Sequence, residues 1–406
     1  MRTAQSTFGW TVINRDELRS VDQWLADEEQ GVRDELGFLI IHQRFADRFF
    51  PGTSTQQRRL RYVLFVPWIY NEADQQPPKV NRQEFIHQSF LQLTRKLLKC
   101  NESGIIGGKI YPRPPSIPQD TIYWSALRAW NVLQPIGNDG TPSCAEAVRY
   151  LESTKHRHTR ISEELDASSE YQHLFCTLPA SNPIDHLAKS GGLSFRITGE
   201  EKRWLRAKLC LVKRGGDSSR QSLLGRLVEN GMSVEEVEFP WDSRVLNVAD
   251  EMDKRALAVA RQAAGLVAIG RGVYGALVEQ ARRKDGLPKS VLPFDALTEA
   301  WDSYASEAAK TDLSELKEWI GEMPPLLEKV LQVTLDWLPS GDLQKFGTLL
   351  PHYAGAELDR KGSQRARLGR STESRERRKD WKPETKAEPL HYRWPLVRIF
   401  LTDLRR

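Results

Sequence analysis

The sequence predicts a mainly α-helical protein. The chain has 406 residues, of which 39 % are hydrophobic and 28 % charged, a soluble globular balance with room for two or three domains. Apolar residues recur at helical spacing in several segments, and no segment alternates with period two between hairpin turns. We therefore expect an N-terminal helical domain (1–150), a larger helical domain (151–358), a basic flexible insertion (359–385) and a terminal helix that returns to the fold (386–406).

The N-terminal domain begins with three predicted helices. The first spans Asp16–Leu25, and the second runs from about Arg33 to Phe50, where Pro51-Gly52 stops it. A hydroxyl of Thr53, Ser54 or Thr55 then caps a third helix that extends to Trp68. Helix, short turn and helix together predict a helix-turn-helix-like segment over residues 33–68, with or without a wing.

Further elements follow from local signals along the chain. The run Tyr111–Pro118 contains too many prolines for regular structure and predicts a stiff extended loop. The pair Thr198 and Glu201 forms a capping-box pattern at a helix start. The other predicted helices cover Thr121–Trp130, Val248–Arg283 with its weakening glycines, Asp295–Lys310, Leu313–Trp337 and Leu390–Leu404.

The positive charge is concentrated in one segment. The whole chain carries 59 basic and 54 acidic residues, a net charge of +5. Between Arg360 and Lys382 stand ten basic and three acidic residues, a net charge of +7, which leaves −2 for the rest. Clustered arginines attract nucleic-acid phosphate. A solvated linker or a contact with an acidic partner protein explains the same charge, and both alternatives stay open.

The best local signal for binding lies at the predicted start of the third helix. Free N–H groups, the helix dipole and the hydroxyls of Thr53, Ser54 and Thr55 suit a phosphate. The nearby Arg58, Arg59 and Arg61 would hold the same backbone, and Arg113 on the proline-rich loop would add a contact. In a helix-turn-helix this helix would enter the major groove. The alternative is a capped helix whose arginines pair with Asp34, Glu35 or Asp47.

No catalytic, cofactor or metal motif stands out. The segment Gly104–Lys109 resembles a phosphate loop, but its glycine spacing is too short and Ile110 replaces the Ser or Thr that binds magnesium. His156, His158, His173, Cys176, His186 and Cys210 lack zinc-site spacing. We therefore expect no cofactor, no metal and no enzymatic activity.

The compartment follows from what the sequence lacks. Its start has no apolar stretch behind basic residues, and its longest apolar run, Val63–Tyr70, is far too short to span a membrane. The four cysteines are widely separated. We expect a cytoplasmic protein without membrane contact.

Together these motifs resemble a bacterial family of unknown function. The resemblance rests on the PGTST and LFVPWIY combination and spans nearly the whole chain; its segments are Arg33–Gly37 (RDELG), Phe49–Thr55 (FFPGTST), Arg61–Tyr70 (RYVLFVPWIY), Arg113–Val132 (RPPSIPQDTIYWSALRAWNV) and His391–Pro395 (HYRWP). The sequence departs from the family pattern at Arg59-Leu60 and in a longer loop at Ile117–Asp120, and the basic segment resembles a variable insertion.

The resemblance implies an accessory protein of bacterial defence islands, encoded beside helicases and nucleases. We therefore expect a non-enzymatic subunit of an anti-phage defence system that binds nucleic acid, with DNA as the first partner, or acts as a scaffold. The first alternative is a protein-binding adaptor that docks a helicase or nuclease through the PWIY segment or through Tyr392, Arg393 and Trp394. The second is an unrecognised nuclease or hydrolase.

Overall fold

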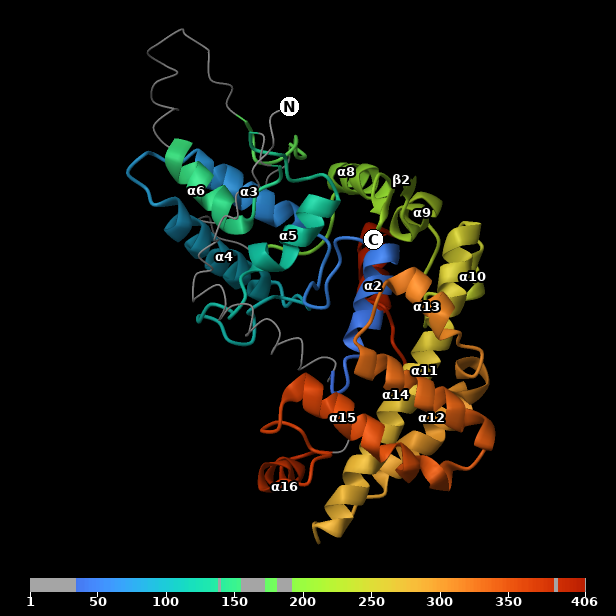
Figure 1. Ribbon diagram of the computed structural model, residues 1–406. Helices are drawn as coiled ribbons and strands as arrows, with labels where there is room; N and C mark the ends of the chain where they lie inside the picture. The colour runs from blue at the N-terminus through green and yellow to red at the C-terminus, as the bar shows by residue number, and fades with distance from the viewer. Residues whose placement is uncertain (1–33, 138–139, 155–171, 181–191, 383–385, 406) are drawn as a thin grey trace, which may run out of the picture.

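A computed structural model describes residues 34–137, 140–154, 172–180, 192–382 and 386–405 (Figure 1). These residues are mainly helical, which confirms the predicted fold class. The described strands are β1 (Lys213–Arg214) and β2 (Asp217–Gln221), a small antiparallel pair. The predicted helix Asp16–Leu25 lies outside the described residues, and the predicted domain boundaries remain predictions.

Four helices form one lobe of the molecule. They are α3 (Tyr62–Asp74), α4 (Arg82–Lys99), α5 (Gln119–Ala129) and α6 (Cys144–Thr154), and α3 packs against both α4 and α5 (Figure 1). Every residue from Tyr62 to Tyr70 is buried. A helix that is hydrophobic on all sides belongs in a core, so α3 has no long face to offer a partner. We had made no prediction for α4 and α6.

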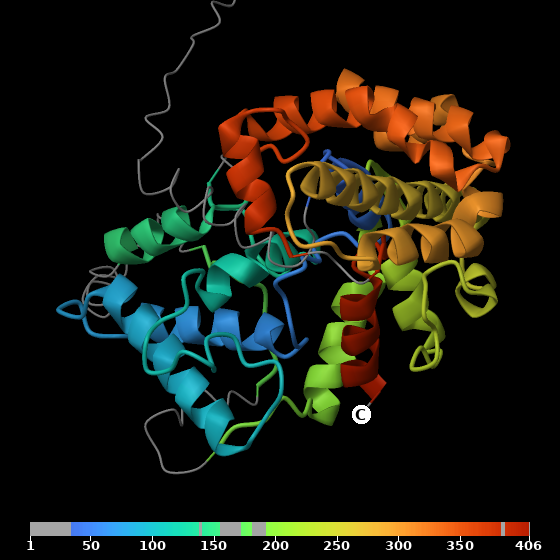
Figure 2. The same ribbon diagram turned by 90° about the horizontal axis from the view of Figure 1, so that it is seen from below.

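A long central helix organises the second body. α11 (Glu251–Lys284) packs against α2 (Leu39–Phe49), α12 (Leu292–Ala308), α13 (Leu313–Ile320), α14 (Pro325–Trp337) and α16 (Thr372–Lys379), while α15 (Leu350–Lys361) packs on α14 (Figures 1 and 2). Glycines permit these close approaches: a Cβ on Gly272 would lie 2.9 Å from the Leu297 Cα. By length and composition α11 could cross a membrane, but 78 % of its most apolar window is buried inside the protein, as in a core helix.

The remaining elements complete the described fold. They are α8 (Gly199–Cys210), α9 (Leu223–Asn230), α10 (Ser243–Leu246), the 3₁₀ helices η2 (Leu338–Ser340) and η3 (Leu343–Leu349), and α17 (Trp394–Arg405), which packs on α8 and α9. Of these, η2 packs on α14, and η3 packs on α11, α14 and α15. One continuous hydrophobic core runs through all of them, from Leu36 to Leu404. The groove described below lies where the α3–α6 lobe meets α2.

Several predicted helices are confirmed, with one correction. The capping box at Thr198 and Glu201 is present, and α5, α11, α12 and α17 match their predicted segments within a few residues. The predicted helix Leu313–Trp337 is instead two helices, α13 and α14. Gly321 ends the first with φ at +74°, and Pro324 and Pro325 prevent the ladder from continuing.

The prediction of a flexible basic insertion is wrong for its described residues. Residues 359–382 hold the end of α15 and the whole of α16. Arg378 is 4 % exposed; its Nε donates to Asp285 Oδ2 at 2.6 Å, and its Nη1 donates to the carbonyl of Gly369 at 2.8 Å. Trp381 is buried against Arg282. Arg360 and Arg367 pair with Asp34 and Glu35, so acids far away in the sequence neutralise part of the segment's charge.

The basic segment gives a direct stability test. We expect Arg378→Ala to lower the free energy of unfolding by about 3 kcal/mol, because it leaves Asp285 and two backbone carbonyls without their cation. The exposed Arg377 on the same helix is the control, and Arg377→Ala is expected to change stability by less than about 0.5 kcal/mol. Urea unfolding followed by tryptophan fluorescence measures both. Equal, small effects would show that α16 is not anchored.

Candidate functional site

The segment between α2 and α3, residues 50–61, is a loop pressed against α5. Gly52 has φ at +80°, and a Cβ there would lie 2.8 Å from both Ala129 Cβ and Trp130 Nε1. Trp130 Nε1 donates to the carbonyl of Pro51 at 2.8 Å. The conformation and the space at residue 52 therefore both require glycine, and the loop's entry is held on α5.

Two side chains, one from the loop itself and one from α5, form hydrogen bonds with backbone groups that would otherwise bond within a helix. Gln57 accepts from the Ser54 N–H and donates to the carbonyls of Gly52 and Ile122. The Tyr123 hydroxyl accepts from the N–H groups of Arg58 and Arg59 at 2.9 and 3.0 Å. The predicted helix start at residues 53–55 is therefore wrong, because tertiary partners outcompete the i−4 carbonyls and α3 begins only at Tyr62.

These findings leave the helix-turn-helix prediction unconfirmed. The connection between α2 and α3 is twelve residues long, whereas a helix-turn-helix uses a turn of about three or four. The helix expected to enter the major groove is buried from Tyr62 to Tyr70. Thr53 is also buried, and its hydroxyl donates to the carbonyl of Phe50 at 2.6 Å. Ser54 and Thr55 are half-buried.

Two of the three predicted arginines point inward. Arg59 holds Asp403 of α17 through Nε and Nη2 at 3.1 and 2.9 Å, and its guanidinium lies over the Phe195 ring. Arg61 donates to Glu201 Oε1 at 2.6 Å and to the carbonyl of Ser194 at 2.7 Å. Their side chains are 13 % and 6 % exposed. Asp403 and Glu201 are far away in the sequence, whereas the alternative in the sequence analysis paired these arginines with the nearby Asp34, Glu35 or Asp47.

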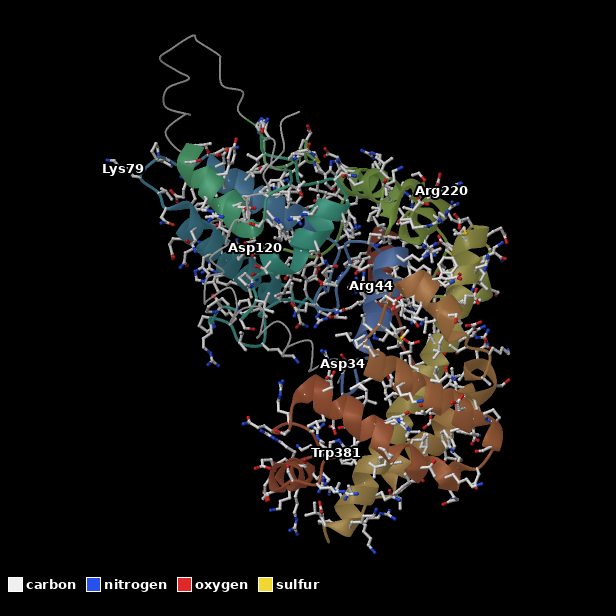
Figure 3. All side chains as sticks on the ribbon, viewed as in Figure 1. Asp34, Arg44, Lys79, Asp120, Arg220 and Trp381 are labelled. Atoms are coloured by element: carbon white, nitrogen blue, oxygen red, sulfur yellow. The ribbon has the colours of Figure 1, made fainter. Side chains whose placement is uncertain are left out.

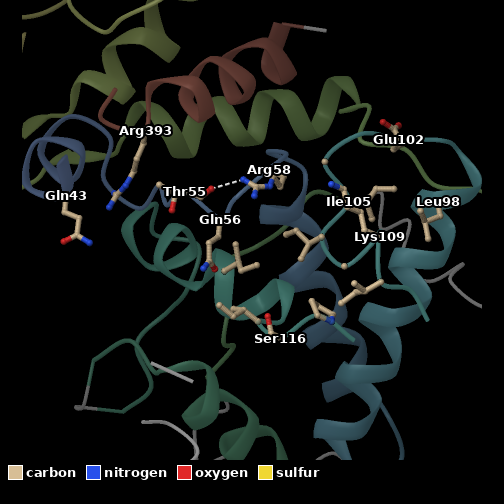
Figure 4. A pocket seen from close by; sticks show the side chains of 18 of the residues that line it. Gln43, Thr55, Gln56, Arg58, Leu98, Glu102, Ile105, Lys109, Ser116 and Arg393 are labelled. Carbon is tan, nitrogen blue, oxygen red and sulfur yellow. Dashed lines mark hydrogen bonds between the residues drawn. The ribbon is translucent and has the colours of Figure 1, made fainter. Parts of the chain in front are cut away.

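Arg58 alone of the three faces solvent, at the edge of a groove (Figure 4). The groove has a volume of about 860 Å³ and lies between α2, the 50–61 loop and the loop 102–118. Its charged lining residues are Arg58, Lys109 and Arg393 against Glu102. The others are Leu39, His42, Gln43, Thr55, Gln56, Leu98, Gly104, Ile105, Ile106, Gly107, Gly108, Ile110, Pro115, Ser116, Ile117 and Ile122.

The glycine-rich loop forms one wall of the groove. Gly107 has φ at +75°, and a Cβ there would lie 3.2 Å from Pro115 Cδ, so the proline-rich run packs directly on the loop. The N–H of Ile106 donates to the Tyr62 hydroxyl at 3.1 Å, which fixes the loop to α3. Lys109 and Arg113 remain exposed, and neither side chain forms a hydrogen bond or ion pair within the described part of the chain.

Arg393, in the segment His391–Trp394, lines the opposite end of the groove. Tyr392 and Trp394 are 0 % exposed, and they donate to the carbonyls of Ala260 and Val237 at 2.7 and 2.9 Å. The prediction that these two rings dock a partner is therefore wrong, because both are core residues. Tyr392 and Arg393 adopt positive φ values of 49° and 62°. This strained backbone aims Arg393 at the groove, where its Nη1 donates to Asp47 and to the carbonyl of Thr53.

His42 of α2 lines the groove beside Arg393 and has an unusual environment. It is 1 % exposed, and its Nε2 has no hydrogen-bond partner in the part of the chain that the structure describes. Burial, followed by the charges of His391, Arg393 and Arg271, holds the pKa of His42 well below its usual value. The imidazole is therefore neutral, and one ring nitrogen is unsatisfied.

Tyr70, Asp120 and Cys144 form a second cluster of reactive side chains, and none of them lines the groove. Tyr70 bonds Asp120 Oδ2 at 2.8 Å and contacts Cys144 Sγ at 3.1 Å, but burial raises the pKa of the Cys144 thiol and keeps it neutral. Among the described residues no three His, Cys, Asp or Glu side chains are grouped to hold a metal. His156, His158 and His186 lie outside those residues.

Sequence reasoning missed part of this site. Lys109 stood in a glycine-rich motif that we dismissed as a nucleotide loop, and its place in a groove wall depends on Pro115 and Tyr62. His42 and Gln43 carried no signal, since both fall within an amphipathic helix. Of the predicted residues, the structure brings Thr55, Arg58 and Arg393 to the groove.

The Arg59–Asp403 pair is expected to hold the loop in place. In Asp403→Ala the guanidinium of Arg59 and the N–H of Leu60 lose a buried acceptor, so the free energy of unfolding should fall by about 3 kcal/mol or more. Amides of residues 57–60 should also exchange faster in hydrogen-exchange measurements. Asp380→Ala, at an exposed site, is the control. Unchanged exchange in Asp403→Ala would show that Gln57 and Tyr123 hold the loop without it.

The comparisons with known proteins identify the family and no function. No curated protein and no solved structure matches the chain. The profile of one family matches residues 6–319, which is more than three quarters of the chain and includes every groove residue except Arg393. The chain belongs to this family, a family of unknown function designated DUF6361.

Proposed function

We propose that the protein binds a single-stranded segment of nucleic acid in the groove beside the 50–61 loop, and that it does so as a non-enzymatic accessory subunit. The observation that carries this proposal is the set of cations around the groove. Arg58 and Lys109 are exposed and have no carboxylate partner among the described residues, and the side chain of Arg58 donates only to carbonyls of its own loop. These two cations can bind a phosphate without first breaking an ion pair within the protein, which favours phosphate binding.

The only carboxylate among the lining residues is already engaged. Glu102 accepts from the N–H of Phe195 at 2.9 Å and lies 3.6 Å from Arg59 Nη1. It therefore repels a polyanion less than a free carboxylate would. Arg113 extends the cationic edge along the proline-rich loop, and Arg44 is exposed on the neighbouring α2 (Figure 3).

The groove also offers apolar surface on which nucleobases can pack. Its wall includes Leu98 and Ile110, each 39 % exposed, together with Ile105 and Ile117. Tyr111, which follows Ile110 in the chain, is 36 % exposed. Aromatic and aliphatic surface beside cations is typical of sites that hold single strands, in which the bases are free to stack on the protein.

The size of the groove favours a single strand over a duplex. Its volume of about 860 Å³ lies within the range of pockets that hold ligands the size of one or a few nucleotides. Duplex recognition commonly inserts a helix into the major groove, and α3 is buried in the core. The function proposed here therefore replaces major-groove binding with contacts to phosphates and bases of one strand.

The biological setting is part of the proposal. The resemblance described above implies that such proteins are encoded beside helicases and nucleases in bacterial defence islands, and these enzymes produce or follow single strands. We propose that this subunit holds such a strand for a partner enzyme. The adaptor alternative keeps only Arg393 of its suggested docking side chains, because the PWIY segment, Tyr392 and Trp394 are core residues.

Binding to a fluorescein-labelled 12-nucleotide oligothymidylate, measured by anisotropy from 20 to 300 mM salt, tests the proposal. The affinity should fall as salt rises. Arg58→Ala combined with Lys109→Ala should weaken binding about tenfold at 100 mM salt and reduce the slope of log K against log salt by about 1.4, because each lost phosphate contact contributes about 0.7 on a single strand.

Two controls make the result specific. Arg220→Ala removes an exposed arginine of β2, remote from the groove (Figure 3), and should leave binding unchanged. A blunt 12-base-pair duplex should bind more weakly than the single strand. If the double variant binds as tightly as the original chain, or if no strand binds at low salt while a partner protein co-purifies, the groove is not a nucleic-acid site.

A further inference from the structure

The two ends of the groove differ in chemistry. Glu102, Leu98 and Lys109 lie at one end, and Gln43, Thr55, Gln56 and Arg393 gather at the other (Figure 4). No lining residue at the Arg393 end carries a carboxylate. The nearest acid that contacts it is Asp47, which bonds Arg393 Nη1 and is 62 % exposed. This end therefore holds one guanidinium, paired with an exposed carboxylate that water screens, with amide and hydroxyl groups around it.

Arg393 itself is fixed there rather than flexible. Its side chain is 10 % exposed, and Nη1 donates to the carbonyl of Thr53 at 2.7 Å as well as to Asp47. Its Nε is buried and unpartnered among the described residues. A guanidinium held in this way retains hydrogen-bonding capacity and loses little side-chain entropy when an anion arrives.

His42 stands directly behind this end of the groove. Its ring centroid lies 5.1 Å from that of His391, and its ring stacks on Tyr392 at 5.9 Å. The charged and titratable groups that face it are Arg271 from α11 and His391, Tyr392 and Arg393 from the segment before α17. His391 in turn is influenced by Arg271 and Glu388. The groups whose charge lowers the pKa of His42 are His391, Arg393 and Arg271, and burial lowers it most.

We infer that the Arg393 end of the groove binds one phosphate group of the nucleic acid and that His42 takes up a proton when it does. This inference rests on the proposed function. Arg393, Thr55 and Gln43 supply donors to the phosphate oxygens. Asp47, the carboxylate that pairs with Arg393, is largely exposed, so a phosphate bound at Arg393 adds negative charge beside His391, Arg393 and Arg271. This added charge favours the protonated form of His42.

The sign of the pH dependence follows from the lowered pKa of His42. In the free protein His42 is neutral because burial and neighbouring cations disfavour its charged form. A phosphate next to the cluster favours that form, so its pKa is higher in the complex than in the free protein. Binding then consumes a proton, and the affinity rises as the pH falls, by up to about tenfold per pH unit for one proton.

The test is the affinity of the 12-nucleotide oligothymidylate at pH 6, 7 and 8 and constant ionic strength. A phosphodiester does not titrate in this range, so a pH dependence belongs to the protein. We expect tighter binding at pH 6 and, in calorimetry with two buffers of different ionisation enthalpy, the uptake of close to one proton. His42→Gln should abolish both effects and keep the salt dependence. His87→Gln, at an exposed site on α4, should retain both.

Two further arms identify the source of the phosphate. The same strand carrying a 5′-phosphate should bind at least tenfold more tightly if the site takes a chain end, and equally if it takes an internal phosphodiester. If the site takes a chain end, Arg393→Met should remove the tighter binding of the 5′-phosphorylated strand. If it takes an internal phosphodiester, Arg393→Met should remove the pH dependence of the affinity.

The outcomes separate the inference from the function on which it rests. If the strand binds with salt dependence but without proton uptake in the unmodified protein, the inference is wrong and the proposed function stands. If no strand binds, the proposed function fails, and inorganic phosphate becomes the probe. The histidine NMR signal that is lost in His42→Gln should then titrate at higher pH with phosphate than without, and an unchanged titration would overturn the inference.

Discussion

The groove depends on the capture of one loop by distant side chains. Residues 50–61 are held by the Tyr123 hydroxyl and by Asp403, which accepts from both Arg59 and the N–H of Leu60. Gln57 of the loop itself donates to the carbonyl of Ile122. Asp403 lies 343 residues beyond Leu60 in the chain. Because these partners replace local helical bonds, α3 starts late, Arg59 and Arg61 turn inward, and Arg58 is left at the groove.

A second constraint joins the C-terminal segment to the same site. Tyr392 and Trp394 are anchored in the core through hydrogen bonds to Ala260 and Val237, and the strained backbone between them presents Arg393. Tyr392 and Trp394, which look like a surface motif in the sequence, therefore position the side chain of Arg393. The inward arginines stabilise the fold, and the outward ones are available to a ligand, although both kinds come from the same short stretch of chain.

Ion pairs also decide how much of the positive charge is free to bind a ligand. The basic segment dominates the net charge, yet its members Arg360, Arg367 and Arg378 pair with Asp34, Glu35 and Asp285. Such pairs attach α15 and α16 to the rest of the protein. The number of free cations is therefore smaller than the number of basic residues in the segment. The groove has few charges, but Arg58 and Lys109 are unpaired among the described residues. For the binding of a polyanion, unpaired cations matter more than the net charge of the whole chain.

The sequence by itself determined the helical class, the capping box at Thr198, the long α11 and the stiff proline-rich loop, because periodicity, caps and proline act over a few neighbouring residues. It also pointed to Thr55, Arg58 and Arg393 as residues of interest. Only the tertiary structure decided which way each side chain faces. The start of α3, the inward turn of Arg59 and Arg61, the burial of Tyr392 and the unsatisfied His42 all depend on partners between about 65 and 350 residues away. Such long-range competition for hydrogen bonds leaves no periodic trace in the sequence.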